Sequence, residues 1–363
     1  MHNKKFIFIV FITSLLMMIF VGVVNFVVDP GYVYLKKYYN TKTDEYVKKI
    51  FMSKQGLVSE GWNERVVKTA MAKYAGDFDC ILLGSSHIMQ VSSVRKTGDI
   101  QKVCTKLLNL GVSGGSFEDM AVFTNIILEN KEKPKQVFLD IDPWTLKFGM
   151  DKRYQINQLY YDSLIKKLDD KTQKFNHFDY QISLIKNLFN LKYFFRSLKE
   201  LNTIFKEPQI ELPKNNFTYN NGYLKALTLP DGSHLYATKW MNEQKVQIKQ
   251  LPLGGGDYKI NGKDYDEKVV EYLIKIIKLY KVHDIKVSFI MTPYHPNVFK
   301  VKSKTVKHIE EVDKIVTKIS KVYGISVYGS FFPEKLGCKD DEFLDFMHPT
   351  TQCLDKIQFG KIK

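Results

Sequence analysis

The chain alternates between short apolar runs and longer segments in which apolar residues recur every three or four positions. Five runs have the length and composition of buried strands, namely Phe78–Leu83, Val103–Leu110, Gln136–Ile141, Lys286–Met291 and Ile325–Tyr328. Amphipathic helices are predicted before the third, fourth and fifth runs, with apolar residues at Phe117, Met120, Phe123 and Ile127, at Val270, Leu273, Ile274 and Ile277, and at Val306, Ile309, Val312, Val316 and Ile319. Strands that alternate with helices predict an α/β fold built on a doubly wound parallel sheet.

The N-terminal segment has the features of a membrane anchor. Phe6–Val28 is apolar and uncharged, and at about 1.5 Å per residue it is long enough for a hydrocarbon core of about 30 Å. Lys4 and Lys5 precede it, which favours a cytoplasmic N-terminus and an extracytoplasmic domain after Asp29. A cleaved signal peptide is the alternative, but its apolar region is shorter and no small-x-small cleavage site precedes Asp29, so we expect a retained single-pass anchor.

Changes in composition divide the chain into six predicted regions. These are a cytoplasmic N-terminus (1–5), the transmembrane anchor (6–28), a juxtamembrane stalk (29–76), the two parts of the α/β domain (77–148 and 265–363) and an insertion (149–264). The insertion has a helical pattern at Ile182–Phe205, then turn signals at Asn220-Asn221-Gly222, Pro230-Asp231-Gly232 and Gly254-Gly255-Gly256, of which the second predicts a hairpin. We expect the insertion to cap the sheet edge, as a lid or a partner surface.

Composition describes a folded protein with a strongly basic surface. The 363 residues are 44% hydrophobic, which is enough for a substantial core, and the net charge is +15. The lysines are scattered, so a solvated surface is the simplest interpretation, and attraction to anionic lipid headgroups or an acidic glycan is the functional one. The anchor argues against a nucleic-acid partner, because it places the domain outside the cytoplasm.

Four cysteines in an exported domain have the number needed for two disulfides. Cys338 and Cys353 flank a candidate catalytic motif, whereas Cys80 and Cys104 fall on two predicted neighbouring strands. Three pairings are open, and free buried thiols are the alternative, because Cys80 lies in an apolar run where a small hydrophobic residue serves equally well.

The candidate chemistry is a serine, a histidine and an aspartate at opposite ends of the chain. Ser86 follows the first strand in the turn Gly84-Ser85-Ser86, at the edge where open α/β sheets bind ligands. Asp345 stands three residues before His348, so that it can hold one ring nitrogen while the other faces Ser86. The alternatives are a serine that caps a helix and a histidine with a structural role.

These segments resemble sequence blocks of the SGNH (GDSL-like) hydrolases. Gly84-Ser85-Ser86 is similar to the first block, Asn109–Gly114 to the second and Asp345–His348 to the fifth, in the same order. The resemblance implies a flavodoxin-like sheet and a serine hydrolase mechanism. With its anchor and its Gly-Ser-Ser turn, the chain is further similar to envelope proteins that act beside membrane-bound O-acyltransferases in polysaccharide acetylation or teichoic-acid alanylation.

The resemblance also implies an oxyanion hole, in which the N–H of Ser86 is joined by the N–H of Gly114, with Gly111 and Gly115 as alternatives. A tight turn between strand and helix also accounts for these glycines. The family has an asparagine donor after the third strand, whereas this chain has Asp142 there, which donates only when protonated. Either Asp142 is protonated, another group completes the hole, two donors suffice, or the chemistry is not simple hydrolysis.

A further loop ends a strand at the same edge. Tyr294 and His295 lie there before Pro296. Contact with substrate and a structural role in a rigid loop are two interpretations of these residues that the sequence supports equally. His87 follows Ser86 directly and is expected to point elsewhere.

The leading functional hypothesis is a serine-dependent acyl esterase or O-acyltransferase that acts on a cell-envelope glycan without a cofactor or metal. Its substrate is an acyl ester or glycan, and a membrane-bound O-acyltransferase is the implied partner. One alternative is a non-catalytic SGNH-shaped scaffold that binds glycan or an assembly partner. The other is a glycosyltransferase whose metal is held by Asp140 and Asp142.

Overall fold

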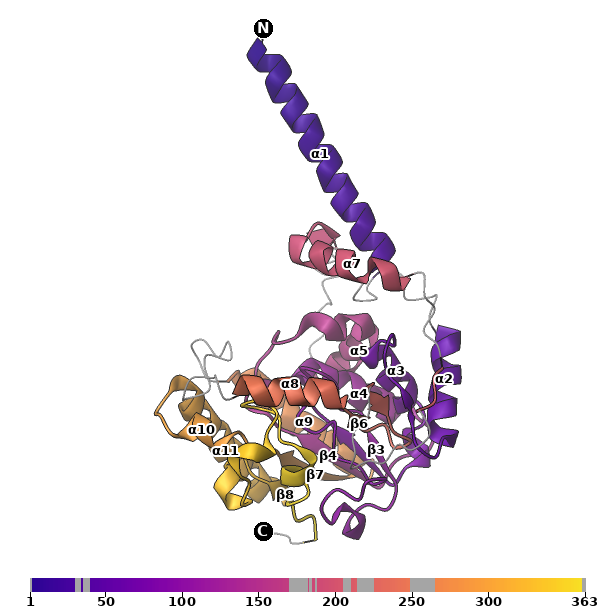
Figure 1. Ribbon diagram of the computed structural model, residues 1–363. Coiled ribbons are helices and arrows are strands. Elements are labelled where there is room, and N and C mark those ends of the chain that lie inside the picture. Colours follow the sequence, from indigo (N-terminus) through magenta and orange to yellow (C-terminus); the bar gives the residue numbers. More distant parts are fainter. Residues whose placement is uncertain are drawn as a thin grey trace. The chain divides into compact units, whose positions relative to one another are not determined.

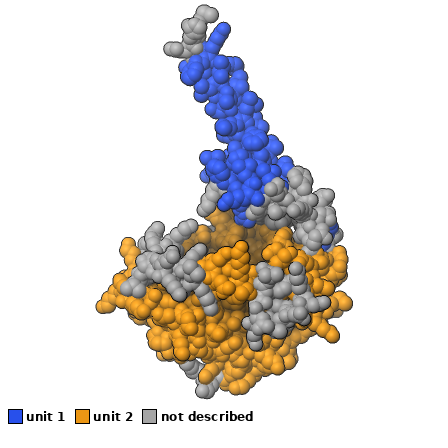
Figure 2. Space-filling model, viewed as in Figure 1, with its two compact units in different colours: residues 1–42, 171–209 blue, residues 43–170, 210–363 orange. Residues whose placement is uncertain are grey.

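The computed structural model describes residues 2–29, 34, 40–169, 182, 185–186, 188–204, 210–213, 225–248 and 265–360. It forms two compact units (Figure 2). The first contains residues 1–42 and 171–209, and the second contains residues 43–170 and 210–363.

The second unit is built around a five-stranded parallel sheet (Figure 1). Its strands are β2 (Cys80–Leu83), β3 (Leu107–Asn109), β4 (Gln136–Asp140), β7 (Lys286–Met291) and β8 (Ser326–Gly329), in the spatial order β3-β2-β4-β7-β8. Ile81 pairs with Leu108 on one side and Val137 on the other. Counted along the chain, this is the flavodoxin-like order, in which ligands bind where the order reverses, between β2 and β4. The predicted α/β class and its parallel sheet are confirmed.

Apolar residues on both faces of the strands explain why the sheet is central. Ile81 and Leu83 point into the larger core, which is covered by α4 (Phe117–Glu129), α9 (Glu267–Val282) and α11 (Lys304–Tyr323). Leu82 and Phe138 point to the opposite face. That face is covered by residues from the loop after β2 and from the C-terminal segment, namely Ile88, Val91, Ile100, Leu354, Ile357 and Phe359. Strands buried on both faces read as continuous apolar runs, which is the pattern in the sequence.

The ends of the covering helices follow familiar capping rules. At α4, Ser116 and Asp119 form a capping box. At α11, the Ser303 side chain accepts a hydrogen bond from the Val306 N–H. The long α11 then stops at Gly324, which allows the chain to turn into β8.

The second unit begins earlier than the predicted stalk allows. Helices α2 (Asn40–Met52) and α3 (Glu64–Ala72) pack into the larger core through Tyr46, Ile50 and Met71, none of which is exposed. These residues lie on single faces of short amphipathic helices, a pattern that lysines and acids elsewhere in residues 29–76 obscure. Most of the region predicted as a stalk is therefore part of the globular unit.

The predicted insertion, residues 149–264, is divided among three places. Helix α5 (Gln158–Leu168) packs against α4. Residues 171–209 belong to the first unit, where α7 (Leu191–Ile204) confirms part of the predicted helical pattern. The predicted hairpin is present as β5 (Leu227–Thr228) and β6 (His234–Leu235), which form a small antiparallel sheet with β1 (Leu57–Val58) and precede α8 (Thr238–Ile248). The turn signals at 220–222 and 254–256 lie outside the described residues.

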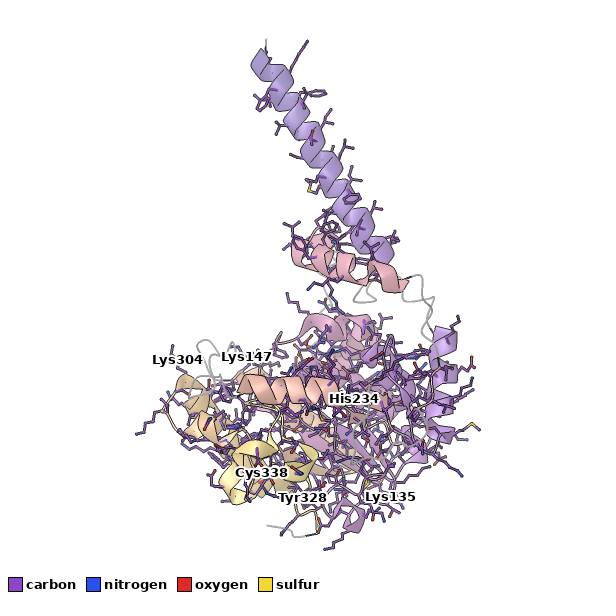
Figure 3. The ribbon with its side chains drawn as sticks, in the orientation of Figure 1. Lys135, Lys147, His234, Lys304, Tyr328 and Cys338 are labelled. Carbon is purple, nitrogen blue, oxygen red and sulfur yellow. A yellow bond between two sulfur atoms is a disulfide. The ribbon has the colours of Figure 1, made fainter. Side chains whose placement is uncertain are left out.

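The first unit consists of the N-terminal helix α1 (His2–Val28) and the helix α7 packed against it. Residues Lys4–Val28 are long and apolar enough to cross a membrane. Side chains project from α1 along its length (Figure 3), and large apolar residues from Phe6 to Val27 are exposed.

Candidate active site

The turn that carries Ser86 follows directly from strand β2. Residues 86–99 form turns rather than a helix, so Ser86 does not cap one. The Asp231 carboxylate, at the tip of the β5–β6 hairpin, instead accepts hydrogen bonds from the Ser92 hydroxyl at 2.7 Å and the Ser93 N–H at 2.8 Å. This hairpin therefore fixes the loop after Ser86, and part of the predicted insertion borders the site.

Ser86, His348 and Asp345 form a continuous hydrogen-bonded chain. Ser86 Oγ lies 2.7 Å from His348 Nε2, and His348 Nδ1 lies 2.7 Å from Asp345 Oδ2. An ionised carboxylate only accepts hydrogen bonds, so the ring proton belongs on Nδ1. Nε2 is then free to accept the hydroxyl proton of Ser86. This is the geometry in which a histidine acts as a general base towards a serine.

Hydrogen bonds keep Asp345 ionised although it is partly buried. Burial raises its pKa, but the His348 side chain lowers it, and so do the N–H groups of Met347 at 2.7 Å and His348 at 2.8 Å, leaving a pKa of about 2. The carboxylate is thus negatively charged at neutral pH and favours the Nδ1–H tautomer of His348.

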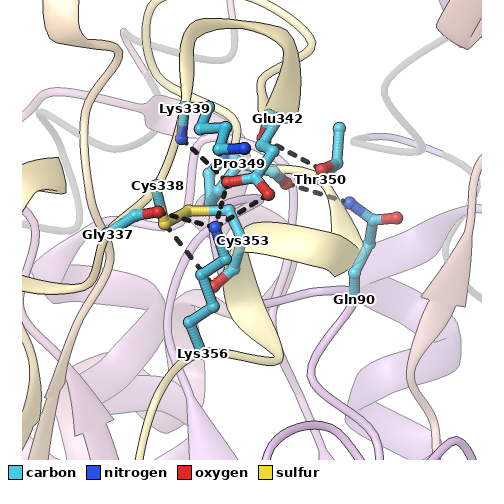
Figure 4. Close-up of a disulfide and its surroundings, with 9 residues drawn as sticks. All are labelled: Gln90, Gly337, Cys338, Lys339, Glu342, Pro349, Thr350, Cys353 and Lys356. Atoms are coloured by element: carbon cyan, nitrogen blue, oxygen red, sulfur yellow. Dashed lines mark hydrogen bonds and ion pairs between the residues drawn. A yellow bond between two sulfur atoms is a disulfide. The ribbon is translucent and has the colours of Figure 1, made fainter.

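Several contacts hold the loop of Asp345 and His348 in place (Figure 4). A disulfide joins Cys338 to Cys353 across this loop. The Lys356 ammonium is 2.6 Å from the Glu342 carboxylate, and Gln90 Nε2 donates to the Pro349 carbonyl at 3.2 Å. Because Gln90 belongs to the loop after Ser86, this last bond ties the two halves of the site together.

The second disulfide joins Cys80 to Cys104, so both bonds follow one of the three pairings that the sequence allows. Cys80 is the first residue of β2. Cys104 precedes β3, which is shorter than the predicted strand. The bond therefore anchors the segment that leads into β3 beside the strand that carries Ser86.

The glycine-rich turn after β3 packs directly against the Ser86 turn. A Cβ atom at Gly115 would lie 2.3 Å from the Gly84 carbonyl oxygen, so only glycine allows this approach. Two of the candidate oxyanion donors already have acceptors: the Gly111 N–H donates to Asn109 Oδ1 at 2.8 Å and the Gly115 N–H to the Val112 carbonyl at 2.9 Å.

The N–H groups of Ser86 and Gly114 make no hydrogen bond within the described part of the chain. Gly114 has φ +59°, a conformation that glycine adopts readily. Unused backbone donors beside a nucleophile are what an oxyanion hole requires. Of the glycines considered from the sequence, Gly114 is therefore the one whose N–H remains available.

Asp140 and Asp142 lie beneath the Ser86 turn and are fully buried. The Ser85 N–H donates to Asp140 at 3.1 Å, and Asp142 Oδ1 lies 2.9 Å from Nδ1 of His87. Burial raises the pKa of both carboxyls, that of Asp142 to about 6, and the neighbouring Asp142 raises the pKa of Asp140 further. At neutral pH we therefore assign the proton of this pair to Asp140, which leaves Asp142 as an acceptor.

His87 is also fully buried, and it completes this cluster. Burial lowers its pKa to about 3, and the nearby His348 lowers it as well. The ring is therefore neutral, and its Nδ1 also lies 3.1 Å from Thr292 Oγ1. No group of three or more His, Cys, Asp or Glu residues is arranged to hold a metal ion in the described ranges.

Tyr294 and His295 occupy buried positions. His295 Nδ1 accepts from the Asn297 N–H at 3.0 Å, and its Nε2 lies 3.1 Å from the Asp340 carbonyl oxygen. Tyr294 packs its ring against His87 at 5.5 Å between centroids. With both ring nitrogens engaged, His295 supports the loop that carries Asp345, which favours the structural interpretation over contact with substrate.

Sequence reasoning gave no role to two residues that support the site. Asn109 Nδ2 donates to the carbonyls of Ile88 at 2.7 Å and Val91 at 2.8 Å, which shapes the loop after Ser86. Gln90 joins that loop to the His348 loop, as described above. Asn109 at the end of an apolar strand was the only visible signal, and nothing in the sequence marked Gln90.

No protein-family model matches the chain, and no curated protein matches it either. The function is therefore inferred from the geometry of the residues themselves.

Proposed function

We propose that this chain is a serine-dependent acyl esterase or O-acyltransferase of the SGNH type that acts on a cell-envelope glycan. The observation that carries the proposal is the chain of contacts Ser86–His348–Asp345, with 2.7 Å at each step. The flavodoxin-like strand order and the Gly84-Ser85-Ser86 turn support the family assignment.

The first half of the reaction forms an acyl-enzyme. Ser86 Oγ attacks the ester carbonyl carbon while His348 Nε2 removes the hydroxyl proton, and Asp345 stabilises the imidazolium. The N–H groups of Ser86 and Gly114 donate to the developing oxyanion, and each donor lowers the activation barrier by on the order of 3 kcal/mol. His348 then returns the proton to the leaving alcohol as the C–O bond breaks.

The second half of the reaction decides between hydrolysis and transfer. His348 deprotonates a second nucleophile, which attacks the acyl carbon and releases Ser86. Water yields a carboxylic acid, and a sugar hydroxyl yields an acylated glycan. Every step uses side chains and backbone groups of this chain.

The proposal places the active unit at the outer surface of a membrane. Helix α1 is long and apolar enough to span, and Lys4 and Lys5 favour a cytoplasmic N-terminus. Two disulfides fit an oxidising compartment outside the cytoplasm. There the unit meets a glycan under construction, and a membrane-bound O-acyltransferase is the proposed source of acyl groups.

Ester turnover by the purified full-length protein tests the proposal. With p-nitrophenyl acetate, Ser86→Ala is expected to lower turnover by about 10⁴-fold or more, because the nucleophile is lost. Ser320→Ala is the matched control, since Ser320 lies in the last turn of α11 and its hydroxyl donates to the Thr317 carbonyl of the same helix at 2.9 Å. Equal turnover by Ser86→Ala and the control would remove Ser86 from the mechanism.

A non-catalytic scaffold is the second candidate, and one observation favours it. Asp142 stands where the related enzymes have an asparagine donor, and its carboxyl is buried against His87. A scaffold with an incomplete oxyanion hole would bind glycan without acyl transfer. Its Ser86 would then react with acyl donors no faster than an ordinary serine.

A further inference from the structure

Helix α7 carries an exposed apolar stripe. Leu191 and Phe195 are each 62% exposed and Leu198 is 41% exposed. They stand at positions i, i+4 and i+7, so they lie on one face of the helix. Leu201, at 37%, continues the stripe by another turn. Such a face is costly in water and needs an apolar neighbour.

Another face of α7 is fixed to the end of α1, and its contacts set the helix in place. Ser197 Oγ donates to Asn25 Oδ1 at 2.9 Å, and the Tyr193 hydroxyl donates to Asp29 at 2.8 Å. The ring of Phe194 packs edge-on against Phe20 at 6.1 Å. Phe20 and Asn25 belong to the last three turns of α1, Asp29 follows its last residue, and α7 lies across that end (Figure 1).

Asn25 marks the depth along α1 at which α7 is attached. About 20 residues of helix cross a hydrocarbon core, and Asn25 is the twentieth residue of the apolar stretch that starts at Phe6. Its side chain is fully buried, and its Nδ2 donates to the Leu188 carbonyl at 2.8 Å. A polar residue satisfied in this way is suited to the boundary between hydrocarbon and headgroups.

Cationic residues flank the apolar stripe. Arg196 follows Phe195 and is turned by about 100° from it, away from the stripe, whereas Lys199 stands at i+4 from Phe195 and borders the stripe on that side. Both are exposed. An apolar stripe bordered by Arg and Lys is typical of helices that lie in a membrane interface, where the charges reach anionic headgroups.

We propose that α7 lies in the lipid–water interface of the membrane that α1 crosses, with Leu191, Phe195 and Leu198 in contact with lipid. The inference rests on the proposed anchor, because α7 is attached near the end of the span, at Asn25. Lipid is favoured over a protein partner because the stripe, the boundary position of Asn25 and the flanking cations coincide. The chain is then held to the bilayer by two elements.

Spin-label accessibility in the full-length protein tests this placement. Single cysteines at Leu191, Phe195, Leu198 and Arg196 carry the label, while the native cysteines remain paired. The protein is reconstituted in vesicles of phosphatidylcholine and phosphatidylglycerol. Oxygen collects in lipid and a nickel chelate stays in water, so the ratio of the two accessibilities is expected to be several-fold higher at the three stripe positions than at Arg196.

A label at Leu16 in α1 separates the two levels of the proposal. If Leu16 is accessible to oxygen and the stripe positions match Arg196, the anchor stands and the placement of α7 is contradicted. If Leu16 itself is accessible to the nickel chelate, the anchor fails and the inference fails with it. Protection of the stripe from both reagents, or spin–spin broadening between copies, would assign it to a protein contact and would also contradict the proposal.

Discussion

Asp345 and Asp142 each lie beside a histidine, and their environments shift their pKa values in opposite directions. Asp345 is 28% exposed, and three N–H groups donate to it, which lower its pKa to about 2. Asp142 is fully buried, its Oδ1 lies 2.9 Å from the single donor site Nδ1 of His87, and burial raises its pKa to about 6. The supply of donors, more than burial, therefore decides which carboxylate is suited to orient a catalytic histidine.

The two residues also differ in how they are held. Asp345 lies on a loop closed by the disulfide between Cys338 and Cys353, whereas Asp142 lies two residues after the end of the central strand β4. The loop holds an ionised carboxylate against His348, and the strand end buries a carboxyl group against His87. This contrast makes different predictions for the same substitution at the two sites.

The largest effect is expected for Asp345→Asn in turnover. An amide at this position no longer selects the Nδ1–H tautomer or stabilises the imidazolium of His348, so turnover should fall by about 10⁴-fold. Initial rates of ester hydrolysis measure the change. A loss of less than tenfold in a folded variant would mean that Asp345 does not orient the base.

The second-largest effect is expected from removal of the disulfide between Cys338 and Cys353. Replacement of Cys338 and Cys353 by serine releases a loop with a sequence separation of 15 residues, which should cost about 3 kcal/mol of stability. Denaturant unfolding under non-reducing conditions measures it. We also expect lower turnover, because Asp345 and His348 lose their support. Unchanged stability would contradict the role given to this bond.

Asp345→Asn and Asp142→Asn should change the stability of the protein in opposite directions. Asp345 is ionised in the folded state down to a pKa of about 2, against an ordinary value of 3.8, so its stabilisation is complete above about pH 4 and is lost as pH falls through 2. Asp345→Asn should therefore cost roughly 1–2 kcal/mol at pH 7 and little near pH 2.

The contribution of Asp142 to stability depends on pH with the opposite sign. Because its folded pKa of about 6 exceeds the ordinary 3.8, the unfolded chain loses the proton first, and the stability contributed by this group falls as pH rises from 3.8 to 6. Asp142→Asn should raise Tm above pH 6 and leave it unchanged below about pH 4. Tm is measured across this pH range for both variants. Shifts of Tm in the same direction would contradict the opposite signs given to the two pKa shifts.

The smallest effect is expected for Asp142→Asn in turnover. If the N–H groups of Ser86 and Gly114 suffice for the oxyanion, this variant should stay within about threefold of the parent at all pH values. If protonated Asp142 is a needed donor, the parent should instead lose activity above pH 6, and the asparagine should restore it. The pH profile of the two proteins separates these outcomes.

The sheet and the three side chains of the candidate site were predictable because their signals are local. Buried strands give apolar runs, and Asp345 and His348 are close in sequence as well as in space. The assignment of residues 43–76 to the globular unit was not predictable, since it depends on where Tyr46 and Met71 pack. The cluster of Asp140, Asp142 and His87 was likewise hidden, because a pKa follows from neighbours that only the fold brings together.

The role of His295 was also not predictable from the sequence. A histidine before proline at the end of a strand has the same appearance whether it faces substrate or supports a loop. Its contact with the Asp340 carbonyl is set by the return of a segment 45 residues later. Gln90 and Pro349 are joined across an even longer separation.

Covalent labelling shows directly whether His348 and Asp345 activate Ser86. The full-length protein is treated with a fluorophosphonate, and the modified residue is located by peptide mass spectrometry. We expect one adduct, on Ser86, which forms much more slowly in Asp345→Asn. An unlabelled Ser86 in the folded parent, or equal labelling of Ser86 in the variant, would contradict this activation.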